Sequence, residues 1–284
     1  MGSLDPSWSQ RLPKPAQGLR LAREAQRLLV WNDQWLAWYN IKGEIQAQKR
    51  FSSPIRDAQL SEDGTAFVVV LEDSSLHWLK SDLQTRWHHS LGSKPLAIAV
   101  DCLGVFVALS DSKGTVTVFD AEGVRFREIQ SPRAVHHLGF LPISGHLLAV
   151  ADLGWLAAYD FEKSDWVWRG TLFFNVAYTS LAGSGDPILI GSFTESVAAF
   201  HADGSRFEFP FKLPSSKAVR FTFDGQQLCA LGRDGILRGF TLTGREFISV
   251  PESMGITHLE LDGLGTRLYL CTAEGDLKAF HVDR

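Results

Sequence analysis

The amino-acid sequence predicts an all-β fold, a seven-bladed β-propeller built from four-stranded antiparallel blades. Three observations carry this prediction. A repeat of about 40 residues runs the length of the chain, glycines mark the turns between short apolar segments, and the N-terminal segment resembles a strand that is missing at the C-terminus. Short strands and tight turns at a fixed period are typical of sheets stacked around an axis.

The repeat is clearest at the residue that closes one short apolar run in each unit. These seven residues are Tyr39, Leu79, Phe119, Tyr159, Phe200, Phe240 and Phe280. They are 40 or 41 residues apart, and an aliphatic residue stands three positions before each of them. Helical spacing is sustained nowhere, which argues against helical repeats of similar length. Seven such units fit a propeller in which neighbouring sheets bury each other's faces.

Glycines mark the turns between the expected strands. One set stands four positions after the closing residue, at Gly43, Gly123, Gly204 and Gly244. A second set stands fifteen positions before it, at Gly64, Gly104, Gly185, Gly225 and Gly265. Tight hairpin turns require positive φ angles, which glycine adopts readily. Each unit is therefore expected to form four short strands of one antiparallel sheet.

The two ends of the chain predict how the ring closes. The last unit stops four residues after Phe280, before the outer strand that earlier units have. Residues 8–12 resemble residues 87–91, which belong to an expected outer strand. We expect residues 7–12 to complete the last blade, because closure removes exposed sheet edges. The prediction is a single domain over residues 1–284, with 1–17 as the outer strand of the last blade and blades at approximately 18–51, 52–92, 93–131, 132–173, 174–212, 213–250 and 251–284.

Composition and charge limit the class of partner. The formal net charge is −4, and nucleic-acid binding usually requires a basic surface, so we expect no nucleic-acid partner. No apolar run approaches the roughly 20 residues that cross a bilayer, so no direct membrane insertion is expected. The N-terminal residues lack the apolar core of a secretory signal, and the three cysteines are widely spaced. These features predict a reducing intracellular compartment and a cytoplasmic location.

One repeat in particular resembles a known superfamily. Residues 219–244, VRFTFDGQQLCALGRDGILRGFTLTG, are similar to repeats of the WD-repeat and quinoprotein-type propellers, and the resemblance covers essentially the whole chain. It implies intracellular scaffolding or complex assembly, with other proteins as partners. No Trp-Asp dipeptide closes any unit, and the Gly-His pair that enters WD repeats is missing. The family's His–Asp network is therefore not expected here.

Charged residues are expected on one face of the ring. An acidic residue precedes the third strand of each unit, at Asp33, Asp73, Asp111, Asp152, Glu195, Asp234 and Glu274. We interpret these residues as caps of their own turns. Basic residues lie where the chain enters successive units, and four of them are candidate contacts for an acidic or phosphorylated partner: Arg56, Lys94, Arg133 and Lys217. A solvated rim is the alternative interpretation.

Three aromatic residues are further candidates for partner binding. Trp35 and Trp155 stand four positions before the closing residue, where most other units have small or polar residues. Phe193 lies in the adjacent turn of the next unit. Exposed aromatic residues are typical anchors of protein interfaces. Burial against the neighbouring blade is the alternative for all three.

Motifs of catalysis and metal binding are missing from the sequence. It contains no Gly-x-Ser-x-Gly, His-Glu-x-x-His, Gly-x-Gly-x-x-Gly or phosphate-binding loop. The adjacent histidines at 88–89 and 136–137 would point to opposite faces of their strands, so neither pair is expected to grip a metal. We therefore expect no catalytic residue, cofactor or metal, and a monomeric propeller that acts as a non-catalytic scaffold within a hetero-complex. Two alternatives stay open: an enzyme with its site in the central channel, and a propeller that binds a small ligand or glycan.

Overall fold

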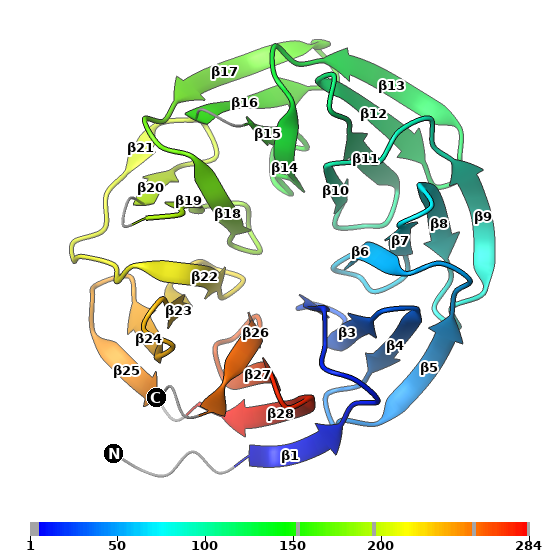
Figure 1. The fold of residues 1–284 in the computed structure, drawn as a ribbon. Coiled ribbons are helices and arrows are strands. Elements are labelled where there is room, and N and C mark those ends of the chain that lie inside the picture. The colour runs from blue at the N-terminus through cyan, green and yellow to red at the C-terminus, as the bar shows by residue number, and fades with distance from the viewer. Residues whose placement is uncertain (1–5, 152–153, 195–196, 252–253, 283–284) are drawn as a thin grey trace.

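The chain forms seven four-stranded antiparallel sheets, arranged as blades around a central channel (Figure 1). This computed structural model describes residues 6–151, 154–194, 197–251 and 254–282. The predicted fold class is confirmed in the number of blades, in the four strands of each and in their antiparallel pairing. Within the described ranges no helix is long and apolar enough to cross a membrane.

Blades 1 to 3 each run from an inner strand at the channel to an outer strand at the rim. Blade 1 consists of β2 (Gly18–Ala22), β3 (Arg27–Asn32), β4 (Trp35–Tyr39) and β5 (Ile45–Arg50). Blade 2 consists of β6 (Ile55–Leu60), β7 (Phe67–Leu71), β8 (Ser75–Leu79) and β9 (Thr85–Ser90). Blade 3 consists of β10 (Ala97–Val100), β11 (Phe106–Ser110), β12 (Thr115–Asp120) and β13 (Arg125–Gln130).

Blades 4 to 6 repeat this order, and blade 7 combines both ends of the chain. Blade 4 consists of β14 (Val135–Phe140), β15 (Leu147–Ala151), β16 (Trp155–Asp160) and β17 (Asp165–Thr171). Blade 5 consists of β18 (Val176–Leu181), β19 (Ile188–Ser192), β20 (Val197–Phe200) and β21 (Arg206–Phe207). Blade 6 consists of β22 (Ser216–Phe221), β23 (Gln227–Gly232), β24 (Leu237–Thr241) and β25 (Glu246–Val250). Blade 7 consists of β26 (Ile256–Leu261), β27 (Arg267–Thr272), β28 (Asp276–His281) and β1 (Pro6–Arg11).

The strand β1 closes the ring as the sequence predicts. It pairs antiparallel with β28, with Trp8 opposite Ala279 and Arg11 opposite Asp276. Figure 1 shows it on the outer side of blade 7, next to the last strand of the chain. The indole of Trp8 also donates a hydrogen bond of 2.8 Å to the carbonyl of Ile41 in blade 1. The closing strand therefore joins blade 7 to the start of the ring.

Contacts of this kind explain one set of recurring glycines. The indole of Trp87 in blade 2 donates to the carbonyl of Ala121 in blade 3, over 2.9 Å. The nearby Gly123 has a φ of 82°, and a Cβ there would lie 3.0 Å from the Trp87 ring. Glycine is thus needed at this turn for two reasons. It adopts the positive φ angle readily, and it has no Cβ to collide with the packed Trp87 ring. Gly43 meets Trp8 in the same way, so the repeat records contacts between blades as well as turns within them.

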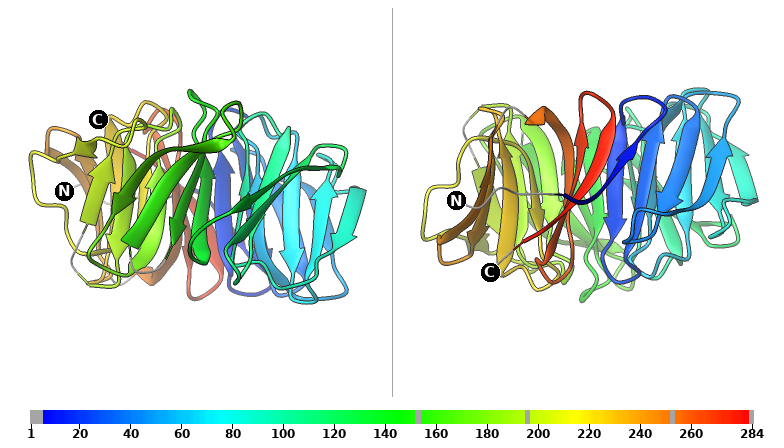
Figure 2. Two further views of the ribbon diagram at one scale, coloured as in Figure 1. Left: turned by 90° about the horizontal axis from the view of Figure 1, so that it is seen from above. Right: turned by 90° about the horizontal axis from the view of Figure 1, so that it is seen from below.

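The turns divide between two faces of the disc, seen edge-on in Figure 2. We define the entry face as the side of the disc that carries two kinds of segment. These are the loops that lead from one blade to the next, and the turns between the second and third strands of each blade. Backbone hydrogen bonds join these two kinds of segment, as between Phe51 and Gln34 and between Leu172 and Gly154. The opposite face carries the turns between first and second and between third and fourth strands. The predicted charged and aromatic candidates all belong to segments at the entry face.

Candidate functional site

Two phenylalanines project from the entry face at blade 5. Phe173, in the loop from β17 to β18, is 97% exposed, and Phe193, in the turn after β19, is 64% exposed. Val176 and Ser192 are cross-strand partners, so both rings lie at the same end of the β18–β19 pair. Large apolar side chains with this exposure are typical of interaction sites.

Trp155, another aromatic candidate, is half-buried in blade 4 against the core between blades 3 and 4, on the side that faces away from blade 5. It opens β16 opposite Thr171, which is two residues before Phe173. Its ring packs edge-on against Trp166, with 5.1 Å between ring centroids. Packing on one side fixes the ring, and the rest of it stays accessible at the face.

Two basic residues of blade 6 border the aromatic residues. Arg233 is exposed and donates a hydrogen bond of 3.0 Å to the carbonyl of Ser192, the residue before Phe193. The exposed Lys217 lies two residues after Ser215, whose hydroxyl donates to the Thr194 carbonyl over 3.0 Å. Lys217 has no ion-pair partner among the described residues. We call the set Phe173, Phe193, Lys217 and Arg233 the blade 5 patch.

The other predicted basic residues lie elsewhere on the face. Lys94 and Arg56 both contact the Glu72 carboxylate, at 2.8 and 3.8 Å. The hydrogen bond from Lys94, together with both positive charges, lowers the pKa of Glu72. These two cations are thus partly neutralised within the protein. Arg133 is exposed at the entry to blade 4, in a third location.

Trp35 lies on blade 1, away from the blade 5 patch. It is half-buried against the core between blades 7 and 1, and its indole donates to the Gln48 side chain over 3.1 Å. The structure therefore brings together Phe193 and Lys217 from the predicted set, and it separates Trp35, Trp155, Arg56, Lys94 and Arg133 from them.

The acidic residues before the third strands act mainly as turn caps, as predicted. The Oδ1 atoms of Asp73, Asp111 and Asp234 accept backbone hydrogen bonds at 2.8 to 3.0 Å from residues two positions further on. Asp33 instead forms an ion pair with Lys14, at 3.0 Å. Asp152 and Glu195 lie outside the described residues.

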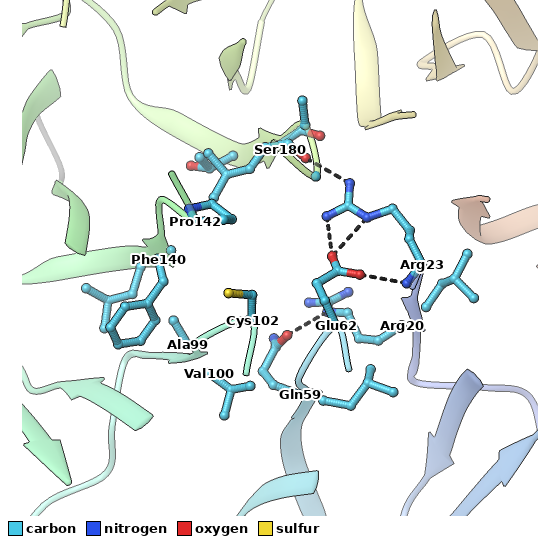
Figure 3. Close-up of a pocket in the computed structure, with 18 of the residues that line it drawn as sticks. Arg20, Arg23, Gln59, Glu62, Ala99, Val100, Cys102, Phe140, Pro142 and Ser180 are labelled. Carbon is cyan, nitrogen blue, oxygen red and sulfur yellow. Dashed lines mark hydrogen bonds and ion pairs between the residues drawn. The ribbon is translucent and has the colours of Figure 1, made fainter. Parts of the chain in front are cut away.

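The central channel carries a separate group of polar residues on the inner strands. It encloses a cavity of about 250 Å³. Arg20 donates to Gln59 in the next blade over 3.2 Å, and Arg220 forms a 2.8 Å ion pair with Glu260. Figure 3 shows a third arginine, Arg23, reaching across the mouth of the channel.

Arg23 closes this mouth at the opposite face by bonding to several blades. Its side chain forms an ion pair with Glu62, and its Nε lies 2.9 Å from the Glu62 Oε1. The guanidinium also donates to the carbonyls of Leu181 in blade 5 and Phe221 in blade 6, at 3.3 and 3.5 Å. Because these partners use most of the donors, the group is already engaged within the protein.

The channel has one thiol, Cys102, near Glu62 (Figure 3). Burial raises the pKa of the Cys102 thiol, so the protonated, weakly nucleophilic form is favoured. In the part of the chain that the structure describes, no three His, Cys, Asp or Glu residues are grouped to hold a metal.

Comparison with known proteins identifies the architecture. No protein-family model matches the chain, and no curated protein sequence matches it at a significant level. The solved structure of the Neurospora crassa Pan2 WD40 domain matches with a TM-score of 0.79, over 100% of this chain and 97% of that one. The chain has the WD40-like seven-bladed β-propeller fold.

At 13% sequence identity, the likeness to the Pan2 domain shows the fold alone. WD40-like propellers are commonly platforms for protein interaction, but one fold hosts many functions. The function of this WD40-like propeller therefore has to be argued from its own surface.

Phe173 and Arg233 are the patch residues that the sequence analysis missed, and Phe173 is the more exposed anchor. The stretch from Leu172 to Phe174 looks apolar and strand-like, and it hides a loop residue among buried neighbours. A signal was present, because proline occupies the corresponding entry loops at Pro54, Pro95 and Pro132. A Phe-Phe pair in an entry loop departs from that pattern.

Proposed function

We propose that this WD40-like propeller is a non-catalytic scaffold that docks another protein of a larger complex through the blade 5 patch. The observation that carries the proposal is the exposure of both Phe173 and Phe193 at the same end of a strand pair. The strands beneath them are buried, with Ile188, Leu189 and Ile190 fully covered. A surface held this rigidly loses little conformational entropy on binding.

The charge of the patch favours an acidic partner segment. Lys217 and Arg233 are both exposed, whereas the neighbouring Asp234 carboxylate forms a 2.8 Å ion pair with Arg238. Among the residues that the structure describes, the accessible charge beside the two phenylalanines is therefore mainly positive. An apolar anchor flanked by Asp, Glu or phosphorylated side chains would complement it.

The channel supports this proposal over the alternative of a channel enzyme. Its charged groups are paired across neighbouring blades, as Arg220 with Glu260 and Arg23 with Glu62. Such pairs hold the inner strands in place, so these charged groups of the channel are already engaged within the protein.

We also propose that the protein works in a reducing compartment, with a cytoplasmic location. All three cysteines are free, and Cys229 and Cys271 are buried. Burial raises the pKa of each of these two thiols to about 12. Unreactive, unpaired thiols fit a core that folds without disulfides.

The test is removal of the two anchors. The variant F173S/F193S should fold normally and lose its partner in affinity purification from the native host, read by quantitative mass spectrometry. Truncating aromatic hot spots typically costs about 2 kcal/mol or more each, which is enough to lose a complex. The matched control is L103S/I143S, whose side chains are 61% and 80% exposed on the opposite face. Equal recovery of the same partners by both variants would contradict the proposal.

A further inference from the structure

Blade 5 has an incomplete outer strand. β21 contains two residues, whereas the outer strands of the other blades contain five to seven. It pairs only with the last two residues of β20. Val197 and Ala198, which precede them, have no outer-strand partner in the described part of the chain. In blade 6 the residues three and two positions before the closing Phe240, Leu237 and Arg238, are both paired by β25.

The chain leaves blade 5 where Phe211 packs on blade 6. The Phe211 ring lies 5.3 Å from that of Phe240, and its side chain covers Gly244. In blade 2, Trp87 covers Gly123 in the same way, and it stands eight residues after the closing residue Leu79. Phe211 stands eleven residues after the closing residue Phe200. The longer segment contains Pro210, which has no N–H to donate to a ladder. Figure 1 shows this segment swinging outward between β21 and β22.

The departure leaves a groove beside the unpaired edge. It has a volume of about 520 Å³, and it is lined on one side by residues 197–199 and on the other by residues 206–209 and 211–213. Three phenylalanines contribute to the second side, at positions 207, 209 and 211. A space of this size is in the range of sites that enclose short ligands.

The unpaired backbone edge of β20 determines what the groove accepts. An antiparallel strand directs its N–H and C=O groups alternately to its two edges, so the Val197–Ala198 pair presents one such donor and acceptor outward. Proteins usually cover or block edges of this kind, because they template the addition of another strand. An extended peptide that pairs with an edge and places alternate side chains in pockets is an established mode of recognition.

The charges at the groove favour one kind of peptide. Arg206 and Lys212 are exposed at its ends, and Glu208 is the one acidic residue in its lining. Arg206 lies over the Phe200 ring at 4.5 Å, which holds its guanidinium near the edge. Two copies of this chain joined edge to edge would bring these cations together, whereas a segment with acidic flanks would neutralise them.

We propose that Val197 and Ala198 of β20 capture an extended segment of a partner protein, which extends the short outer strand of blade 5. The segment alternates apolar and polar residues and is flanked by Asp or Glu. It runs antiparallel to β20, as the outer strands do in the other six blades. This site lies at the rim and goes beyond the docking proposed for the entry face, on which it does not depend.

A synthetic peptide tests the proposal directly. The probe is the end-blocked, fluorescein-labelled peptide EVTVE, titrated with the full chain and followed by anisotropy. We expect saturable binding with a Kd below about 1 mM. A copy N-methylated on its central residues cannot donate to the edge and should lose binding. Hydrogen exchange at the outward-facing amide of the Val197–Ala198 pair should slow by about tenfold at saturation.

Protein variants separate this site from others. R206E/K212E should weaken binding of EVTVE by about tenfold, whereas R245E, at the equivalent turn of the complete blade 6, should leave it unchanged. Each variant is first shown to have the thermal midpoint of the wild type. F173S/F193S should bind the peptide normally, so failure at the entry face and failure here are distinguishable. Absence of saturable binding, equal binding of the N-methylated peptide, or protection of the edge by self-association would each overturn the proposal.

Discussion

At the scale of single residues, the propeller contains two kinds of side chain whose position costs free energy: charged groups in the channel and apolar rings exposed to water. The arginines of the channel are removed from bulk water, and each finds a carboxylate, amide or carbonyl in a neighbouring blade, as Arg220 finds Glu260. Phe173 and Phe193 are left in water without comparable compensation. Pairing within the protein explains the channel arginines through their contribution to stability alone. The exposure of the two phenylalanines is not explained in this way, and an external partner would explain it.

His258 gives a residue-level prediction for acid stability. Its pKa is lowered to about 4, first by burial and then by the positive charges of Arg20 and Arg220. In the unfolded chain the pKa is about 6.5, so protonation favours unfolding as the pH falls from about 6.5 to about 4. The pKa difference corresponds to a loss of about 3 kcal/mol at the acid end of that window.

Urea denaturation between about pH 7 and about pH 5 measures this effect. H258Q should lose less stability than the wild type over the interval, because glutamine takes up no proton. H281Q removes an exposed histidine and serves as the control. Parallel stability curves for the wild type and H258Q would show that His258 does not titrate as described.

At the scale of elements, two outer strands depart from the regular repeat in opposite ways. Blade 7 receives its outer strand from the other end of the chain, and blade 5 keeps only the two residues of β21. The first departure was predictable, because residues 8–12 repeat the pattern of residues 87–91. The second was not, because it depends on Phe211 packing against Gly244, a contact between blades that no local period encodes.

The same contrast holds for the candidate site. Trp155, Phe193 and Lys217 were recognisable as positions in a repeat, because each falls in a turn or strand end whose place is fixed by the period. The grouping of Phe193 with Lys217 depends on contact between the loops of blades 5 and 6, as Ser215 touches Thr194, whereas Trp155 packs toward blade 3. The exposure of Phe173 depends on a loop that resembles a strand. Local pattern therefore predicts the elements, and tertiary contact decides which residues act together.

The closing strand yields the element-level prediction. W8A should lower the free energy of unfolding by about 2 kcal/mol, because a half-buried ring and its hydrogen bond to Ile41 are lost. R11A breaks only an ion pair whose arginine side chain is 66% exposed, and it should cost less than about 1 kcal/mol. Thermal and urea unfolding of the two variants makes the comparison. A W8A midpoint equal to that of R11A would mean that β1 contributes little to closure.

At the scale of the whole molecule, Arg23 links parts of the ring that the chain keeps far apart. One side chain in blade 1 contacts Glu62 of blade 2 and carbonyls of blades 5 and 6. Pairing within blades and packing between neighbours hold the ring only step by step around its circumference. The contacts of Arg23 across the channel connect opposite sides of the ring directly. The Arg23–Glu62 pair is therefore expected to contribute to the free energy of unfolding of the whole propeller.

The side chains of Arg23 and Glu62 are each 17% exposed, so removing one partner leaves a largely buried charge unpaired. R23M and E62L should each lower the free energy of unfolding by about 3–5 kcal/mol, while the double variant R23M/E62L should recover most of that loss. Urea denaturation of the four proteins forms a double-mutant cycle. R125M, which breaks the exposed Arg125–Glu128 pair, should cost less than about 1 kcal/mol. A loss in the double variant equal to the sum of the two single losses would show that the ion pair itself contributes little, and that Arg23 acts through its carbonyl contacts in blades 5 and 6.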